Sequence, residues 1–137
     1  MDVRVLLVDD HRDARTALAQ RLRRHAELLL VGVASGLEEA LQLLPQARPS
    51  IVLLDIHGQD GRGVDGCRIL RRLTDAPVVI LTSFMTDDLW AAAREAGAAD
   101  YLLKHIDTER LSRNIIRLVE QHRAGRHREE LPNDTQG

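Results

Sequence analysis

The chain has 137 residues, of which 44% are hydrophobic, and this size and composition are typical of one folded domain with its own core. Its formal net charge of −2 provides no basic field of the kind that dominates nucleic-acid binding, so we expect no direct nucleic-acid contact by this domain. The single cysteine, Cys67, excludes an intramolecular disulfide, and the sequence has neither a signal-peptide-like start nor a run of ~20 apolar residues, which predicts a cytoplasmic protein without a membrane span.

Five short apolar runs alternate with helical patterns. The runs cover residues 3–8, 28–34, 51–54, 77–81 and 99–103. Apolar residues recur at helical spacing over residues 11–25, 37–44, 64–73, 86–96 and 107–123. The first, third and fourth runs are apolar at nearly every position, which is typical of strands buried on both faces of a parallel sheet.

This order predicts an α/β domain with a doubly wound, five-stranded parallel sheet over residues 1–123. Pro45 and Pro49 are expected to bracket the exit of the second helix, and Gly97 predicts the end of the fourth. Residues 124–137 are polar, with glycine and proline, and we interpret them as a tail or linker.

Polar side chains follow four of the predicted strands: Asp9 and Asp10 the first, Asp55 the third, Thr82 and Ser83 the fourth, and Lys104 the fifth. Because the carboxyl ends of parallel strands form the binding crevice of an open sheet, we expect these side chains to converge there. Carboxylates at this density would raise at least one pKa, and Mg²⁺ or Mn²⁺ would remove the conflict. The lysine is explained if a phosphoryl group also binds, and a central carboxylate could itself be the nucleophile.

Four segments in order, VLLVDDH, VLLD, VVILTS and GAADYLLK, resemble the receiver domain of two-component response regulators. The resemblance implies a flavodoxin-like, three-layer α/β/α fold with strand order 2-1-3-4-5. It implies a phosphorylation-dependent signalling switch whose phosphodonor is a sensor histidine kinase or a phosphotransfer protein. Such a protein is no enzyme beyond its own phosphorylation and dephosphorylation. The segments look most like receivers that precede helix-turn-helix output domains.

The resemblance also implies roles for the acids. Asp55 would be the phosphoacceptor and a metal ligand, Asp10 would bind the metal directly, and Asp9 would hold a metal-bound water. The backbone carbonyl of His57 would be the third protein ligand. Taken alone, Asp9 and Asp10 could simply cap the following helix, and only their combination with Asp55 and Lys104 favours the metal site.

Other residues would bind the phosphoryl group and transmit its presence. Lys104 would pair with the phosphoryl group and with Asp55. Thr82, next to Ser83, would donate its hydroxyl to the phosphoryl group. Tyr101 would then rotate inward, although a core or edge aromatic is the simpler interpretation of that residue alone.

The fourth helix, the fifth strand and the fifth helix would form the surface that changes, and so control homodimerisation or an output partner. Trp90 lies on the more polar side of its helix and is a candidate contact on that surface. The alternative is that Trp90 packs laterally on the helix. Cys67 lies among apolar residues and is predicted to be a small buried hydrophobe.

The loop after Asp55 departs from the family, because Gln59 stands where receivers commonly carry a proline. Because of Gly58, Gly61 and Gly63, we expect the unbound loop to have more conformations, which it must lose when it becomes ordered. Two alternatives to the switch remain: a phosphorylation-independent receiver scaffold, and an aspartate-nucleophile phosphohydrolase, which would carry an acid where His57 stands. The chain could be a stand-alone receiver or a fragment of a longer regulator.

Overall fold

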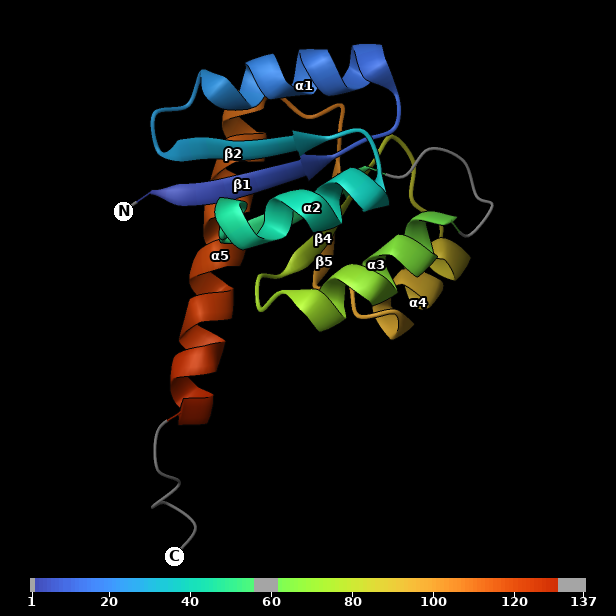
Figure 1. The fold of residues 1–137 in the computed structure, drawn as a ribbon, viewed down its shortest axis with the longest axis vertical. Coiled ribbons are helices and arrows are strands. Elements are labelled where there is room, and N and C mark those ends of the chain that lie inside the picture. Colours follow the sequence, from blue (N-terminus) through green and yellow to red (C-terminus); the bar gives the residue numbers. More distant parts are fainter. Residues whose placement is uncertain (1, 56–61, 131–137) are drawn as a thin grey trace, which may run out of the picture.

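The computed structural model describes residues 2–55 and 62–130, and of residues 62 and 127–130 it describes the backbone alone. Strands and helices alternate strictly over these residues (Figure 1). The strands are β1 (Val3–Val8), β2 (Leu28–Ala34), β3 (Ile51–Asp55), β4 (Val78–Thr82) and β5 (Asp100–Leu103). The helices are α1 (Arg12–Arg23), α2 (Leu37–Ala47), α3 (Arg62–Leu73), α4 (Asp87–Glu95) and α5 (Thr108–Glu130).

The five strands form one sheet in the order β2-β1-β3-β4-β5, and every neighbouring pair is parallel. The predicted doubly wound fold and its strand order are therefore confirmed. The nucleophile candidate belongs to β3, the central strand, so elements on both sides of it can contribute to the site.

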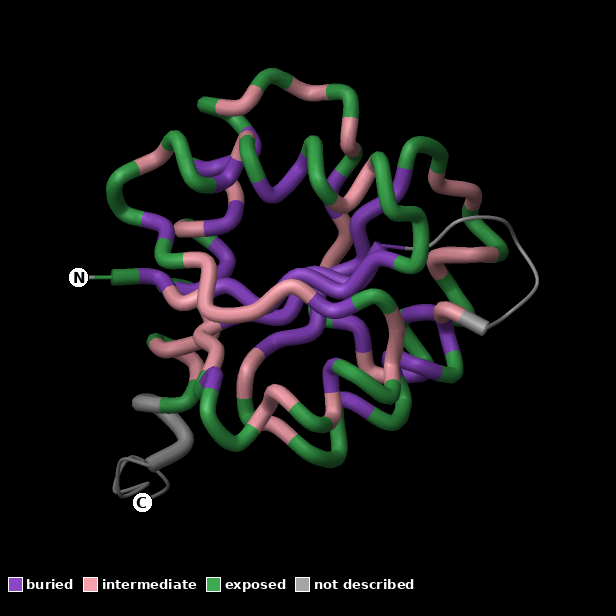
Figure 2. The backbone as a smooth tube through the Cα atoms, turned by 45° about the horizontal axis from the view of Figure 1, so that its top comes forward, coloured by how far each residue is buried: buried purple, intermediate pink, exposed green. Residues whose placement is uncertain are grey.

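Helices cover both faces of the sheet. On one face, Leu53 and Leu81 belong to a core cluster that includes residues of α1 and α5. On the other face, Leu54 and Ile80 belong to a cluster that includes residues of α2, α3 and α4. Neighbouring residues of one strand join different clusters because side chains alternate across a strand. Figure 2 shows the buried positions concentrated on the central strands, as a three-layer α/β/α arrangement requires.

Side chains define where two of the helices begin. The His11 ring nitrogen Nδ1 accepts a hydrogen bond from the Ala14 amide at 3.3 Å before α1. The Thr86 hydroxyl accepts one from the Leu89 amide at 3.1 Å before α4. Each contact satisfies an amide that has no partner inside its helix, which fixes the loop that leads away from the carboxyl edge of the sheet.

The predicted end of the second helix at Leu44 is wrong, although Pro45 and Pro49 do bracket the position where the helix ends. Helix α2 includes Pro45 and ends at Ala47. Proline is tolerated here because it lies in the last turn, where the loss of one amide donor interrupts little of the helix. The helix ends after Ala47 because Arg48 adopts a left-handed backbone (φ 44°), and the Arg48 amide donates to the Leu44 carbonyl.

Helix α5 continues beyond Arg123, where the sequence predicted its end, to Glu130. The His122 ring contacts the Asp75 carbonyl at 2.7 Å, and the Arg126 guanidinium lies 3.3 Å from the Asp75 carboxylate. These contacts hold the helix to the loop before β4, and the helix continues through Gly125, which costs roughly 1 kcal/mol in a helix interior. Residues 131–137 of the predicted tail lie outside the described residues.

Within the described part of the chain, no helix is both long and apolar enough to span a membrane.

Candidate functional site

The carboxyl edge of the sheet gathers polar residues from four strands. Asp9 follows β1, Asp55 ends β3, Thr82 ends β4 and Lys104 follows β5. The parallel register aligns these strand ends, so residues that lie far apart in the sequence meet at one edge. The convergence expected from the sequence is therefore present for these four residues.

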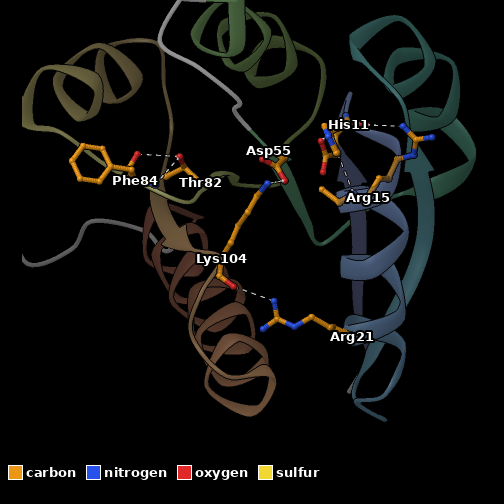
Figure 3. Close-up of polar contacts among 9 residues, drawn as sticks. His11, Arg15, Arg21, Asp55, Thr82, Phe84 and Lys104 are labelled. Carbon is orange, nitrogen blue, oxygen red and sulfur yellow. Dashed lines mark hydrogen bonds and ion pairs between the residues drawn. The ribbon is translucent and has the colours of Figure 1, made fainter.

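Asp55 and Lys104 form an ion pair between the carboxylate Oδ2 and the ammonium Nζ. The Asp55 side chain is 0% exposed and the Lys104 side chain is 14% exposed, so water screens this pair little. Figure 3 shows the Lys104 side chain extending across the edge of the sheet to Asp55. The Lys104 amide donates to the Thr82 carbonyl at 2.9 Å, which ties the lysine backbone to the end of β4.

Asp9 is the second buried acid of the site, with 1% of its surface exposed. Its Oδ1 accepts a hydrogen bond from the His11 amide at 2.9 Å, and its backbone carbonyl accepts one from Arg15 Nη1 at 2.9 Å. The position of this acid is thus fixed from both its side chain and its backbone.

The pKa of Asp55 is raised from 3.8 to about 7. Burial is the main cause, and hydrogen bonding and charge at the Asp9 carboxyl raise this pKa further. The contact with Lys104 lowers the pKa and offsets part of the increase. One lysine therefore does not balance the two carboxylates, and a bound cation would favour the ionised form of both.

The donor set fits a hard divalent cation. Asp9 and Asp55 have carboxylate oxygens, which Mg²⁺ prefers, and the exposed Asp10 follows Asp9 in the chain. Over residues 2–55 and 62–130, however, no cluster of three or more His, Cys, Asp or Glu side chains is placed to hold a metal. The direct ligation by Asp10 stays a prediction, and the predicted His57 carbonyl ligand lies outside the described residues.

The hydroxyl of Thr82 bonds within its own loop. It donates to the Phe84 carbonyl at 3.1 Å and accepts from the Phe84 amide at 3.4 Å (Figure 3). Thr82 is buried, whereas the neighbouring Ser83 is exposed. The sequence did not indicate this contact with Phe84, because any residue two positions further on offers the same backbone groups.

Trp90 and Tyr101 contact each other, with ring centroids 5.2 Å apart and planes inclined by 59°. Both rings are half-buried and pack on the core cluster that α2, α3 and α4 share. Trp90 therefore packs laterally, as in the alternative interpretation of this residue, and its contact with a partner stays a prediction.

Cys67 is fully buried, and burial raises the pKa of its thiol to about 11. This confirms that the residue is a small buried hydrophobe. The sequence did not indicate the contacts of Arg15 and Arg21, because their acceptors include backbone carbonyls, which any residue offers. Arg21 donates to the backbone carbonyl of Lys104 at 3.0 Å.

A family model for the response regulator receiver domain matches residues 5–116. The chain belongs to this family. The receiver is 40% identical over 114 residues to the DNA-binding transcriptional activator DevR/DosR of Mycobacterium tuberculosis, covering 82% of this chain and 52% of that protein. It is 37% identical over 103 residues to the transcriptional regulatory protein LiaR of Bacillus subtilis, covering 74% of this chain and 49% of that protein. The chain thus spans about half the length of the curated relatives it matches.

Solved receiver structures share the fold. A LuxR-family two-component response regulator from Aurantimonas sp. SI85-9A1 superposes with a TM-score of 0.77 at 27% identity, covering 88% of this chain and 87% of that one. The receiver domain of the putative response regulator NarL from Mycobacterium tuberculosis superposes with a TM-score of 0.77 at 23% identity, covering 87% and 97% of the two chains, which supports the fold alone. The resemblance to two-component receivers is confirmed.

Proposed function

We propose that this receiver domain accepts a phosphoryl group on Asp55 from a sensor histidine kinase or a phosphotransfer protein in the cytoplasm, in a reaction that depends on Mg²⁺ or Mn²⁺. The observation that carries this proposal is the buried ion pair of Asp55 and Lys104 beside the second acid, Asp9. Two neighbouring acids disfavour each other's ionised form, so placing Asp9 beside the buried Asp55 does not help the chain to fold. The pairing of these acids therefore supports a functional role.

In the proposed transfer, a carboxylate oxygen of Asp55 attacks the phosphorus atom of the donor. The new P–O bond forms as the donor's P–N bond breaks, and the electron pair of that bond leaves with the imidazole nitrogen. Bound by Asp10, Asp55 and the His57 carbonyl, and by Asp9 through a water, a divalent cation would supply positive charge to the phosphoryl oxygens. Lys104 supplies a second positive charge and can change its partner from the Asp55 carboxylate to the phosphoryl group.

The same phosphoryl group would draw the Thr82 hydroxyl away from the Phe84 carbonyl. The hydroxyl of the adjacent Ser83 would be a further candidate to bind the phosphoryl group. Tyr101 could then move inward and leave its contact with Trp90. This is a population shift between two packings, biased by a local change of charge. The surface of α4, β5 and α5 would change and control homodimerisation or an output partner. Since relatives are named as DNA-binding or transcriptional regulators, a DNA-binding output is the one that we propose.

Acetyl phosphate with Mg²⁺, followed by intact-mass measurement, tests this function. The wild-type chain is expected to gain the mass of one phosphoryl group, and Asp55→Asn is expected to gain none. Asp2→Asn, which replaces an exposed acid before β1, is the matched control and should be phosphorylated like the wild type. An adduct that persists in Asp55→Asn would exclude Asp55 as the acceptor. No adduct on the wild type would favour the phosphorylation-independent scaffold, and release of phosphate from generic esters would favour the phosphohydrolase.

A further inference from the structure

Arg21 of α1 reaches the segment between β5 and α5 with three of its guanidinium nitrogens. Nη1 donates to the Lys104 carbonyl at 3.0 Å, Nη2 donates to the Ile106 carbonyl at 2.7 Å, and Nε donates to the Thr108 hydroxyl at 3.0 Å. Figure 3 shows the contact between Arg21 and the Lys104 backbone, on the far side of the residue from its ammonium group. One side chain thus holds the segment from the residue after β5 to the first residue of α5.

These contacts are well suited to fixing a backbone. The guanidinium is planar and permanently charged, and its donors form a rigid fork, so it cannot satisfy three acceptors unless they keep one arrangement. All three contacts are partly buried, which limits competition from water. Charge-assisted hydrogen bonds are also stronger than those between neutral groups.

The backbone of Lys104 is consequently held on both sides. Its amide donates to the Thr82 carbonyl at 2.9 Å, and its carbonyl accepts from Arg21 at 3.0 Å. A lysine side chain has four rotatable bonds, so its ammonium can occupy many positions when the backbone is free to move. With the backbone fixed, fewer side-chain conformations remain, and those include the one that pairs with Asp55.

We propose that Arg21 is a positioning residue for phosphoryl transfer, because it fixes the backbone from which the Lys104 ammonium reaches Asp55. This inference rests on the proposed function, since it assigns Arg21 a part in that reaction. Arg21 does not act on the phosphoryl group itself. It acts through Lys104, and its removal should therefore matter only while Lys104 is present.

The chain contains a matched control at the opposite edge of the sheet. Arg4, near the start of β1, donates through Nε to the carbonyls of Ala47 and Arg48 at 3.1 and 3.0 Å, and through Nη2 to the Ala47 carbonyl at 2.7 Å. Like Arg21, this half-buried arginine makes three hydrogen bonds, here to the last residue of α2 and the residue that follows it. Replacing Arg4 removes a similar set of contacts far from the carboxyl edge.

The experiment compares the rate of phosphorylation by acetyl phosphate and Mg²⁺ in the wild type, Arg21→Met, Arg4→Met, Lys104→Met and the double variant Arg21→Met/Lys104→Met. Urea unfolding of each variant measures the loss of stability. Arg21→Met is expected to slow phosphorylation roughly tenfold or more, since small misplacements of a reacting or stabilising group have effects of this size. Arg4→Met is expected to keep the wild-type rate despite a comparable loss of stability.

The double variant separates positioning from a general effect on folding. If Arg21 acts through Lys104, Arg21→Met causes no further slowing once Lys104 is replaced, whereas independent effects would multiply. Equal rates for Arg21→Met and Arg4→Met, or a full additional slowing in the Lys104→Met background, would overturn the inference. Absence of an Asp55 adduct on the wild type would instead contradict the proposed function.

Arg21→Lys provides the same comparison if Arg21→Met does not fold. Lysine keeps the positive charge but lacks the fork that spans three acceptors. Its rate should also fall below that of the wild type, and this loss should disappear in the Lys104→Met background. A wild-type rate for Arg21→Lys would show that the fork is not required and would overturn the inference.

Discussion

At the scale of single residues, Asp55 is a carboxylate that the folded chain stabilises in its protonated form. Its side chain is completely buried next to Asp9, and the pKa of about 7 shows that Lys104 offsets only part of this environment. The folded state therefore holds the Asp55 proton more tightly than the unfolded chain does. This has a direct consequence for the pH dependence of stability.

Without a divalent cation, Asp55 should make the free energy of unfolding fall as the pH rises from about 4 to about 7. In this window the unfolded chain releases the proton and the folded chain keeps it, so stability falls by up to roughly 1.4 kcal/mol per pH unit and then levels off. Asp55→Asn removes this ionisation. We expect the variant to exceed the wild type in stability by more at pH 8 than at pH 5, by roughly 1–3 kcal/mol, in urea unfolding with a chelator.

Asp2→Asn is the control for this measurement, because it makes the same substitution at an exposed acid before β1. A constant difference between Asp55→Asn and the wild type at both pH values would mean that the folded state does not favour the protonated acid.

From the sequence, Asp9, Asp55, Thr82 and Lys104 could be predicted to meet at the carboxyl edge of the sheet, because each lies at a strand end. Strand ends can be predicted from apolar runs. The sequence could not identify the present partner of the Thr82 hydroxyl, which is a backbone carbonyl in a loop. It could not identify Arg21 either, since two of the three acceptors of this side chain are backbone carbonyls and all three lie more than 80 positions away. Backbone acceptors carry no residue-specific signal.

At the scale of elements, the backbone conformation of Gly97 explains why α4 ends near this residue, as the sequence predicted. Its φ of 104° lies in the region that L side chains rarely adopt. A Cβ at this position would also stand 1.8 Å from the Cδ atom of Arg71 on α3. The glycine therefore permits both the turn from α4 into β5 and the passage of the arginine side chain.

We expect Gly97→Ala to lower the free energy of unfolding by about 1–3 kcal/mol, because the backbone is strained and Arg71 must move. Gly125→Ala should do the opposite. No atom lies within 4 Å of a Cβ added at Gly125, so alanine should stabilise α5 by about 0.5–1 kcal/mol. Urea unfolding of both variants measures the two effects. No gain for Gly125→Ala would argue against a continuous helix beyond Arg123.

The boundaries of strands and helices show which structural features a local sequence pattern can predict. The predicted ranges of the first two strands agree with β1 and β2, because apolar runs define buried strands. The ends of α2 and α5 were misplaced, because proline and glycine were interpreted as stops. Pro45 is accommodated in a last turn, and Gly125 is accommodated in a helix held by contacts to Asp75, a residue of another loop.

At the scale of the whole molecule, the contact of Trp90 with Tyr101 connects α4 to β5, the strand that leads into Lys104. Under the proposed function, an inward movement of Tyr101 separates the two rings and changes the surroundings of the indole. The chain contains one tryptophan, so its fluorescence reports this single position.

We therefore expect acetyl phosphate and Mg²⁺ to change the fluorescence of Trp90 in the wild type. Asp55→Asn should show no change, because it cannot be phosphorylated. Tyr101→Leu should still gain the phosphoryl mass but show a smaller change in fluorescence. If Tyr101→Leu responded like the wild type, the indole would be sensing something other than the movement of Tyr101.

The three contacts of Arg21 also join the first helix to the segment between β5 and α5, over separations of 83 to 87 positions. Contacts at such separations form only after a large loss of chain entropy, and so depend on most of the molecule being in place. A polypeptide still emerging from the ribosome and lacking residue 104 would carry Asp9 and Asp55 without their counter-charge. A chain could then accept a phosphoryl group only after its synthesis has passed β5. Shorter nascent chains would not be phosphorylated and would not signal.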